Sequence, residues 1–345
     1  MIIGICGHGF TGSGAILDLL KEFDNTNVID NGEFDIPYIP DGLEDLEYHI
    51  KLNPTRLGSD AAIKRFLRLA KAKCRIRNTR RLFNQDKSNE FYRISMRYVK
   101  TLTTVEWNGF WTFDSLTRKT VKEKFSFTVI LRLLRYFQNK HKKAIRVSPF
   151  KKMYLSYTTN FDKITQKYVK EVLAYLGADS DLINVLDQPF SSIKPENDFH
   201  FFPEECKAII VERDPRDIYI MAKKVYPIDM GFIPSDNVTE FISYYKNQRE
   251  LAKNTNSQNI LKIHFEDLIY DYDKTVESIS NFLLLGKQIK QRIFFKPDVS
   301  IHNTQLFRNY PELKDDMKKI EESLGEYLYD FLNIDLFSNT NNIVF

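Results

Sequence analysis

The chain has 345 residues, of which 43% are hydrophobic and 14% aromatic. This composition supports a sizeable buried core and excludes an intrinsically disordered chain. The formal net charge is only +4, but residues 51–170 hold 30 Lys and Arg against 7 Asp and Glu, and the remainder holds 20 against 39. A basic segment of this size is typical of proteins that contact anionic ligands, polymers or membrane surfaces.

The three cysteines, Cys6, Cys74 and Cys206, are too widely spaced for a disulfide framework or a zinc site. We therefore predict no metal and a reducing compartment. The chain begins with a strand-like run and shows no signal peptide, and its most apolar stretch, 125–137, contains two arginines and is too short to span a bilayer. We expect a cytoplasmic protein, with peripheral contact at the inner face of the membrane through the basic segment.

The first twenty residues have the pattern strand, glycine-rich turn, helix. An apolar run from Met1 to Cys6 predicts a buried strand, and apolar residues at helical spacing follow Gly14. Between them stand four glycines in eight residues, at positions 7, 9, 12 and 14. Such a turn lets backbone N–H groups and the positive end of a helix face one anion. The pattern favours phosphate binding over a turn without a ligand.

The turn alone leaves the kind of phosphate ligand open. Gly7 and Gly12 have the spacing of a nucleoside triphosphate-binding loop, but Ser13 stands where that loop has lysine. The run from Gly7 to Gly12 also fits the dinucleotide pattern G-x-G-x-x-G, and Asp30 could bind the ribose. Three nucleotide-binding interpretations therefore remain at this point.

Residues 50–176 differ from the flanking sequence, because basic residues alternate with apolar and aromatic ones at helical spacing. This pattern predicts a basic, mainly helical insertion. Its aromatic residues could stack on nucleic-acid bases or on sugar rings, or form helix cores, and no known nucleic-acid module is present. We expect no nucleic-acid partner. The helices are expected from Ser59 onward and over 88–102, 115–141 and 162–176.

The second half returns to alternating strands and helices. The run 207–212 predicts a buried strand, and Arg213-Asp-Pro-Arg-Asp217 predicts a helix that begins at Pro215 with Asp214 as its cap. Arg213 then stands at the carboxyl end of a strand, where open α/β sheets bind ligands. A structural salt bridge is the alternative role. The remaining expected elements are a helix over 238–253, a strand over 260–265 and helices over 273–285 and 311–331.

Three segments together resemble the sulfotransferases that use 3′-phosphoadenosine 5′-phosphosulfate (PAPS) as donor. They are the loop 7–14, the run Val211-Glu-Arg-Asp-Pro-Arg-Asp217, and His264-Phe-Glu-Asp-Leu268 with the helix that follows it. They occur in the family's order, whereas the basic insertion matches no family pattern. The resemblance implies a P-loop NTPase-like α/β fold, with a mostly parallel central sheet flanked by helices. Its core would comprise residues 1–49 and 177–345, with 50–176 as the insertion.

The resemblance also implies a set of donor-binding residues. The loop would hold the 5′-phosphosulfate, and Arg213, helped by Arg216, would hold the 3′-phosphate. Two positions depart from the family pattern: Phe10 replaces a lysine or arginine, and Met221 replaces a serine. The expected donor-binding residues are Gly9, Phe10, Thr11, Gly12, Ser13, Gly14, Arg213 and Arg216.

The catalytic residues are predicted less directly. A general base must reach the acceptor hydroxyl, and Asp187 and His200 are the candidates. His8, or a lysine of the insertion, is expected to supply the charge that is missing at Phe10. The implied function is in-line sulfuryl transfer from PAPS to a hydroxyl of a carbohydrate or glycolipid, without a metal. The alternatives are a P-loop kinase or NTPase, and a non-catalytic binder of acidic polymers.

Overall fold

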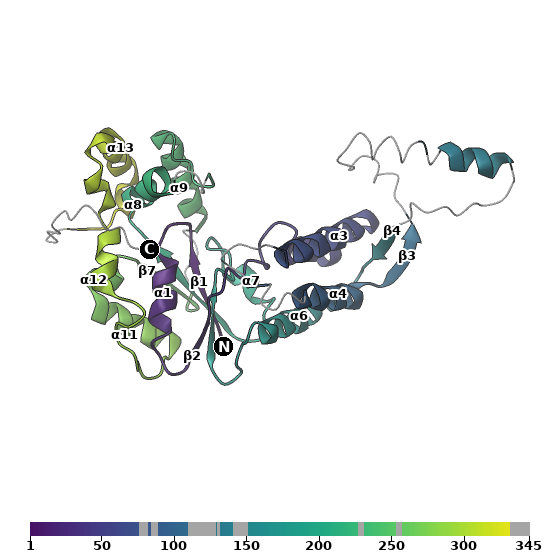
Figure 1. The fold of residues 1–345 in the computed structure, drawn as a ribbon, viewed down its shortest axis with the longest axis horizontal. Coiled ribbons are helices and arrows are strands. Elements are labelled where there is room, and N and C mark those ends of the chain that lie inside the picture. The colour runs from purple at the N-terminus through teal and green to yellow at the C-terminus, as the bar shows by residue number, and fades with distance from the viewer. Residues whose placement is uncertain are drawn as a thin grey trace.

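The structure is a computed structural model, and it describes residues 1–75, 82–83, 89–109, 129, 132–140, 151–226, 231–252 and 257–331. Most of the helix expected over 115–141 lies outside these residues, although residues 132–140 are helical. Figure 1 shows a central sheet with helices on both sides.

The central sheet has five strands, and every neighbouring pair is parallel. β1 (Ile2–Gly7) lies in the middle, between β5 (Ile183–Asp187) and β6 (Cys206–Glu212). β2 (Thr26–Ile29) lies outside β5, and β7 (Ile260–His264) lies outside β6. The expected α/β fold with a mostly parallel central sheet is confirmed. The strands predicted over 1–6, 207–212 and 260–265 are present as β1, β6 and β7, within one or two residues of their predicted bounds.

The two faces of the sheet are covered by different helices. Alternate residues of β1 point to opposite faces, so Ile2 packs in one apolar cluster and Ile3 in another. One cluster includes α1 (Ser13–Leu20) and α11 (Tyr272–Leu283). The other joins the sheet to the helices of the basic segment (Figure 1). Burial on both faces explains why the strands are nearly continuous apolar runs.

The basic segment contains helices and one feature that the sequence did not predict. Its described helices with bounds are α3 (Arg56–Lys73), α4 (Glu90–Leu102) and α6 (Phe161–Tyr175). An antiparallel pair, β3 (Val105–Gly109) and β4 (Lys151–Leu155), extends beyond them. Several of its described aromatic residues form the helix core; for example, the Tyr98 ring stacks on that of Tyr168 at 4.3 Å.

Among the remaining described elements, α8 (Pro215–Ile220) begins shortly after β6. Asp214 caps α8 by accepting a hydrogen bond from the Arg216 N–H, as the sequence predicts. Within the described ranges, no helix is long and apolar enough to cross a bilayer. The other helices are α2 (Leu43–Glu47), a π-helical turn (Tyr48–Leu52), α7 (Glu196–Phe199), α8 (Pro215–Ile220), a second π-helical turn (Met221–Val225), α9 (Val238–Ala252), α10 (Asp267–Tyr270), α12 (Pro297–Ser300) and α13 (Lys314–Leu324), with 3₁₀ turns at Ile301–Asn303, Leu306–Asn309, Pro311–Leu313 and Gly325–Tyr327.

Candidate functional site

The glycine loop, residues 7–14, lies where the strand connections diverge. From β1 the chain runs past β5 to β2, whereas from β5 it runs past β1 to β6. The carboxyl ends of β1, β5 and β6 therefore border crevices of the kind in which open α/β sheets bind ligands.

The backbone of the glycine loop is shaped for a close approach by an anion. Gly9, Phe10 and Gly12 have φ of +88°, +56° and +87°. Gly12 is the N-cap of α1, and no side chain caps this helix. A Cβ added to Gly14 would meet nothing within 4 Å, so the space in front of this first turn is open. Uncapped N–H groups at a helix start favour an anion.

Phe10 serves as an anchor of the loop. Its ring stacks with those of Tyr226 and Phe232, with centroid distances of 5.6 Å in both cases. Its carbonyl accepts a hydrogen bond of 2.8 Å from the Arg213 guanidinium. The ring and the carbonyl of Phe10 therefore both hold the loop in place. These contacts explain why an aromatic residue stands at a position where the resemblance implies a cation.

Arg213 follows β6 and is almost fully buried, with 3% of its surface exposed. Besides the Phe10 carbonyl, its guanidinium donates to the carbonyl of Asn303, and it lies over the Phe265 ring at 5.1 Å. No acceptor for its Nε–H lies within the described residues. Arg213 thus joins the glycine loop to the C-terminal polar segment, and it makes neither of the salt bridges to neighbouring aspartates that were the alternative.

Arg216 lies one helical turn further on and contacts acidic groups. It donates to Asp214 at 2.7 and 2.9 Å and to Glu321 of α13 at 2.9 Å, and it stacks on the Phe307 ring. Burial opposes its charge, but these carboxylates outweigh burial and raise its pKa. Met221, the second departure from the family pattern, is buried in an apolar cluster.

Gln188, which directly follows Asp187, spans the crevice between β1 and β5. Its Oε1 accepts from the Gly7 N–H at 3.2 Å, and its Nε2 donates to the Ser13 hydroxyl at 3.4 Å. Its φ is +49°, in the left-handed region that few residues other than glycine adopt. Asp187 itself is mostly buried, and its carbonyl accepts from the Phe34 N–H at 2.7 Å.

His8 is enclosed beneath the glycine loop. Its Nδ1 lies 3.2 Å from the Ser192 hydroxyl, and its Nε2 lies 3.8 Å from a Glu212 carboxylate oxygen. Burial, together with the charges of Arg249 and Lys262, lowers its pKa to about 2. The ring is therefore neutral at physiological pH and a weak proton acceptor.

His200 lies away from the loop, against α2. Its Nε2 is 3.1 Å from the Glu47 carboxylate, and this partner raises its pKa. The ligand atoms of Glu47, Asp162 and His200 lie within 4.8 Å of one another, as in a metal site. However, the Lys51 ammonium already lies 2.7 Å from both carboxylates and supplies the positive charge.

The structure therefore brings the glycine loop, His8 and Arg213 together, and it places His200 in a separate cluster. Sequence reasoning missed Gln188 and Ser192, which contact the loop from the segment after β5. The position of Gln188 directly after Asp187, at the carboxyl end of a strand, was the signal that could have indicated it.

No family model matches the sequence, and no curated protein matches it. The solved structures that are similar to it include three sulfotransferases or sulfotransferase domains. The sulfotransferase domain from the Synechococcus PCC 7002 olefin synthase is 10% identical, with a TM-score of 0.41, and the match covers 96% of this chain and 95% of that chain. The sulfotransferase domain from the curacin biosynthetic pathway is 12% identical, with a TM-score of 0.39, and the match covers 94% of this chain and 97% of that chain. Sulfotransferase STF9 from Mycobacterium avium is 10% identical, with a TM-score of 0.36, and the match covers 97% of this chain and 77% of that chain. All three TM-scores lie below 0.5, so the similarity does not itself assign a function.

Proposed function

We propose that the protein is a sulfotransferase that uses PAPS as donor and a hydroxyl of a carbohydrate or glycolipid as acceptor. The observation that carries this proposal is the combination at the strand ends. An uncapped helix start follows a glycine loop with positive φ, and the Arg213 guanidinium bonds to that same loop. This combination supports binding of a phosphorylated nucleotide at the carboxyl ends of the strands.

The proposed reaction requires mainly positioning and neutralisation of charge. The sulfur–oxygen bond to the donor phosphate breaks while the acceptor oxygen bonds to sulfur in line, and the acceptor proton passes to a base. Loop N–H groups at positions 11–14 would bind the 5′-phosphosulfate and neutralise charge on its oxygens. Asp187 and His200 remain the proposed bases. The products are a sulfate ester and adenosine 3′,5′-bisphosphate.

The test of the donor site is thermal stabilisation by three nucleotides under identical conditions. Adenosine 3′,5′-bisphosphate should stabilise the protein, because a ligand that binds only the folded state adds about 2.7 kcal/mol at a hundred times its Kd. ATP with Mg²⁺ and NAD should not. A shift with ATP alone would instead indicate a kinase or NTPase, and no shift with any nucleotide would favour a non-catalytic binder.

A matched pair of variants tests whether the nucleotide binds at the loop. Gly14→Asp adds a carboxylate in the open space before α1, so it should fold normally and lose the bisphosphate shift through repulsion of the anion. Gly14→Asn adds a side chain of the same size without charge and should retain most of the shift. Equal shifts in both variants would remove the loop from the binding site.

A further inference from the structure

The loop between α11 and α12 is tied to the protein through one buried acid. Glu22, which stands two residues after α1, is completely buried. Its carboxylate accepts hydrogen bonds from the four consecutive N–H groups of residues 292–295, at 2.9 to 3.2 Å, and from the Gln288 side chain at 2.8 Å. Its carbonyl accepts from the Ile289 N–H at 2.8 Å. Residues 288–295 therefore form a compact turn around this acid, which we call the Glu22 turn.

The outer side of the Glu22 turn is apolar. Ile289, Ile293 and Phe294 are 55%, 57% and 43% exposed. The N–H group of each of them donates to Glu22, so the three side chains emerge close together from a backbone that is held in place. A single exposed apolar side chain needs no explanation, but three large ones gathered on one turn mark an interaction surface.

The charge around this surface has one sign. Residues 287–296 contain four basic residues and no acidic one, whereas the chain outside residues 51–170 holds 20 Lys and Arg against 39 Asp and Glu. The four are Lys287, Lys290, Arg292 and Lys296. All of them are exposed, and none forms an ion pair with another described residue. The Lys290 ammonium lies 5.3 Å from the centre of the Phe294 ring, so charge and apolar surface are adjacent.

Exposed apolar side chains among cations have the chemistry of a surface that docks on an anionic lipid bilayer. The apolar groups enter the boundary between headgroups and acyl chains, and the surrounding cations contact anionic headgroups. A second copy of this chain fits less well, because a symmetric contact would bring the same four cations of each copy together. A turn that is already fixed also loses little conformational entropy when it docks.

The Glu22 turn lies on the opposite face of the sheet from the basic helices. Phe295 belongs to the apolar cluster that contains α1 and α11, whereas buried residues of α3 belong to the cluster on the other face. Figure 1 shows α11 and α12 on the opposite side of the sheet from α3. The turn is therefore a surface separate from the basic segment.

We propose that the Glu22 turn docks the protein on an anionic lipid bilayer, with Ile289, Ile293 and Phe294 inserted among the headgroups. The flanking lysines and Arg292 contact the anionic headgroups. Docking has an apolar component, which salt does not screen, and an electrostatic one, which it does. It depends neither on a nucleotide nor on the sulfotransferase function proposed above.

The test is a fluorescent label on the turn, because the three native cysteines are all buried. Ile293→Cys introduces an exposed thiol for a polarity-sensitive dye and keeps the backbone N–H. Leu251→Cys places the same dye on α9, at a side chain that is 59% exposed. With vesicles of phosphatidylserine and phosphatidylcholine, the emission at position 293 should shift to shorter wavelength, and the emission at position 251 should not. Equal shifts, or no shift at position 293, would overturn the proposal.

Two charge variants, each made in the labelled Ile293→Cys protein, test the electrostatic component. Lys290→Glu/Arg292→Glu should raise the lipid concentration at half of the shift at least about tenfold, since each basic residue near an anionic membrane contributes about 1 kcal/mol. The control Lys274→Glu/Lys318→Glu makes the same change of charge on α11 and α13 and should leave it within about twofold. Equal effects of the two variants would contradict docking through the turn.

Two further outcomes identify other occupants of the surface. A shift of the same size with vesicles of phosphatidylcholine alone would remove the preference for anionic lipid. A shift without lipid that grows with protein concentration would replace the bilayer with a second copy of the chain.

Discussion

Gly12 and Gly14 stand two residues apart in the glycine loop, yet their surroundings differ. Gly12 has φ of +87°, and a Cβ there would lie 2.5 Å from the Phe265 ring. Gly14 has open space around its Cβ position and belongs to the first turn of α1. Substitutions at the two positions therefore distinguish the effect of backbone strain on stability from the effect of replacing a glycine without strain.

We expect Gly12→Ala to lower the free energy of unfolding by about 2 kcal/mol or more, from strain and the clash with Phe265. Gly14→Ala should raise it by about 0.5–1 kcal/mol, because alanine favours the helix. Urea denaturation of both variants measures these changes. Equal effects at the two positions would show that the loop does not require the left-handed conformation at Gly12.

The pH dependence of the free energy of unfolding should reveal the ion pair between His200 and Glu47. The folded-state pKa of His200 is raised by Glu47, so its ion pair stabilises the fold below about pH 6.5 and this contribution is lost as pH rises through the folded pKa. Urea denaturation across this range should show a smaller decline in His200→Gln and in Glu47→Gln. Identical pH profiles for wild type and both variants would contradict the pairing.

At the scale of single residues, the sequence predicted positions better than partners. The glycine loop and Arg213 were both expected at strand ends, and both lie there. The role of Phe10 as an anchor could not be predicted, because Tyr226 and Phe232 lie more than 200 residues away in the chain. The pairing of His200 with Glu47 likewise joins residues that are 153 positions apart. Whether the predicted donor-binding residues bind PAPS stays a prediction.

At the scale of elements, α8 and the C-terminal segment are joined through Asp217. This residue is completely buried, and its carboxylate accepts from the N–H groups of Gln305 and Phe307 at 2.8 and 3.4 Å. Arg213 holds the neighbouring carbonyl of Asn303. The segment that covers the end of β6 is therefore fixed by polar contacts to the Arg-Asp-Pro-Arg-Asp turn.

We expect Asp217→Ala to free the C-terminal segment, because each buried N–H left without an acceptor costs about 1–3 kcal/mol. Hydrogen exchange should accelerate at the Gln305 amide and stay unchanged at the amides of β1. Asp217→Asn retains an acceptor oxygen and should lose less protection. Unchanged exchange at Gln305 in the alanine variant would show that other contacts hold the segment.

The elements with strong periodicity were predicted within a few residues. β6, α9 and β7 are buried apolar runs or amphipathic helices, and local sequence specifies them. The pair β3–β4 was missed because its strands are short, partly exposed and 41 residues apart. The predicted helix over 311–331 was too long, since α13 covers only Lys314–Leu324 and 3₁₀ turns flank it.

At the scale of the whole molecule, the asymmetric charge predicts a surface for anions. On α3, Arg68 and Lys71 border a shallow cavity of about 410 Å³ together with Arg75 at the helix end. Each basic residue near an anionic membrane contributes about 1 kcal/mol to binding at moderate salt.

We expect the variant Arg68→Glu/Lys71→Glu/Arg75→Glu to bind vesicles of phosphatidylserine and phosphatidylcholine at least about tenfold more weakly than the wild type. Cosedimentation at two salt concentrations measures this, and wild-type binding should fall as salt rises. The control Lys274→Glu/Lys318→Glu changes exposed lysines of α11 and α13 and should have little effect. Equal loss in both variants would indicate a nonspecific charge effect.

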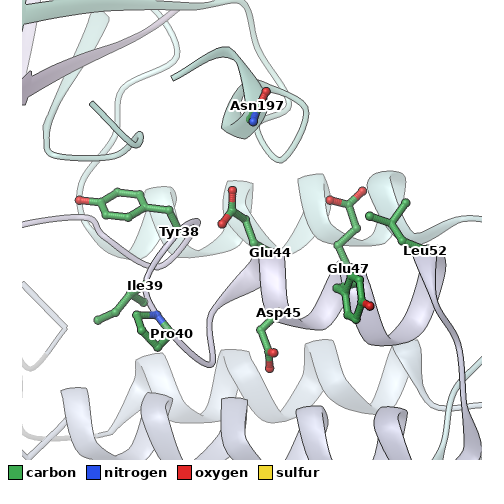
Figure 2. A pocket seen from close by; sticks show the side chains of 9 residues that line it. Tyr38, Ile39, Pro40, Glu44, Asp45, Glu47, Leu52 and Asn197 are labelled. Atoms are coloured by element: carbon green, nitrogen blue, oxygen red, sulfur yellow. The ribbon is translucent and has the colours of Figure 1, made fainter. Parts of the chain in front are cut away.

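The stretch 188–198 has a consequence for how two ligands would influence each other. It contacts the glycine loop through Gln188 and Ser192, and its Asn197 borders a cavity of about 600 Å³ beside α2 (Figure 2). A ligand that orders this stretch from one side reduces the conformational entropy that is lost when the other side is filled. Thermodynamic linkage makes this cooperativity reciprocal, so a nucleotide at the loop and a molecule in this cavity would increase each other's affinity by the same factor.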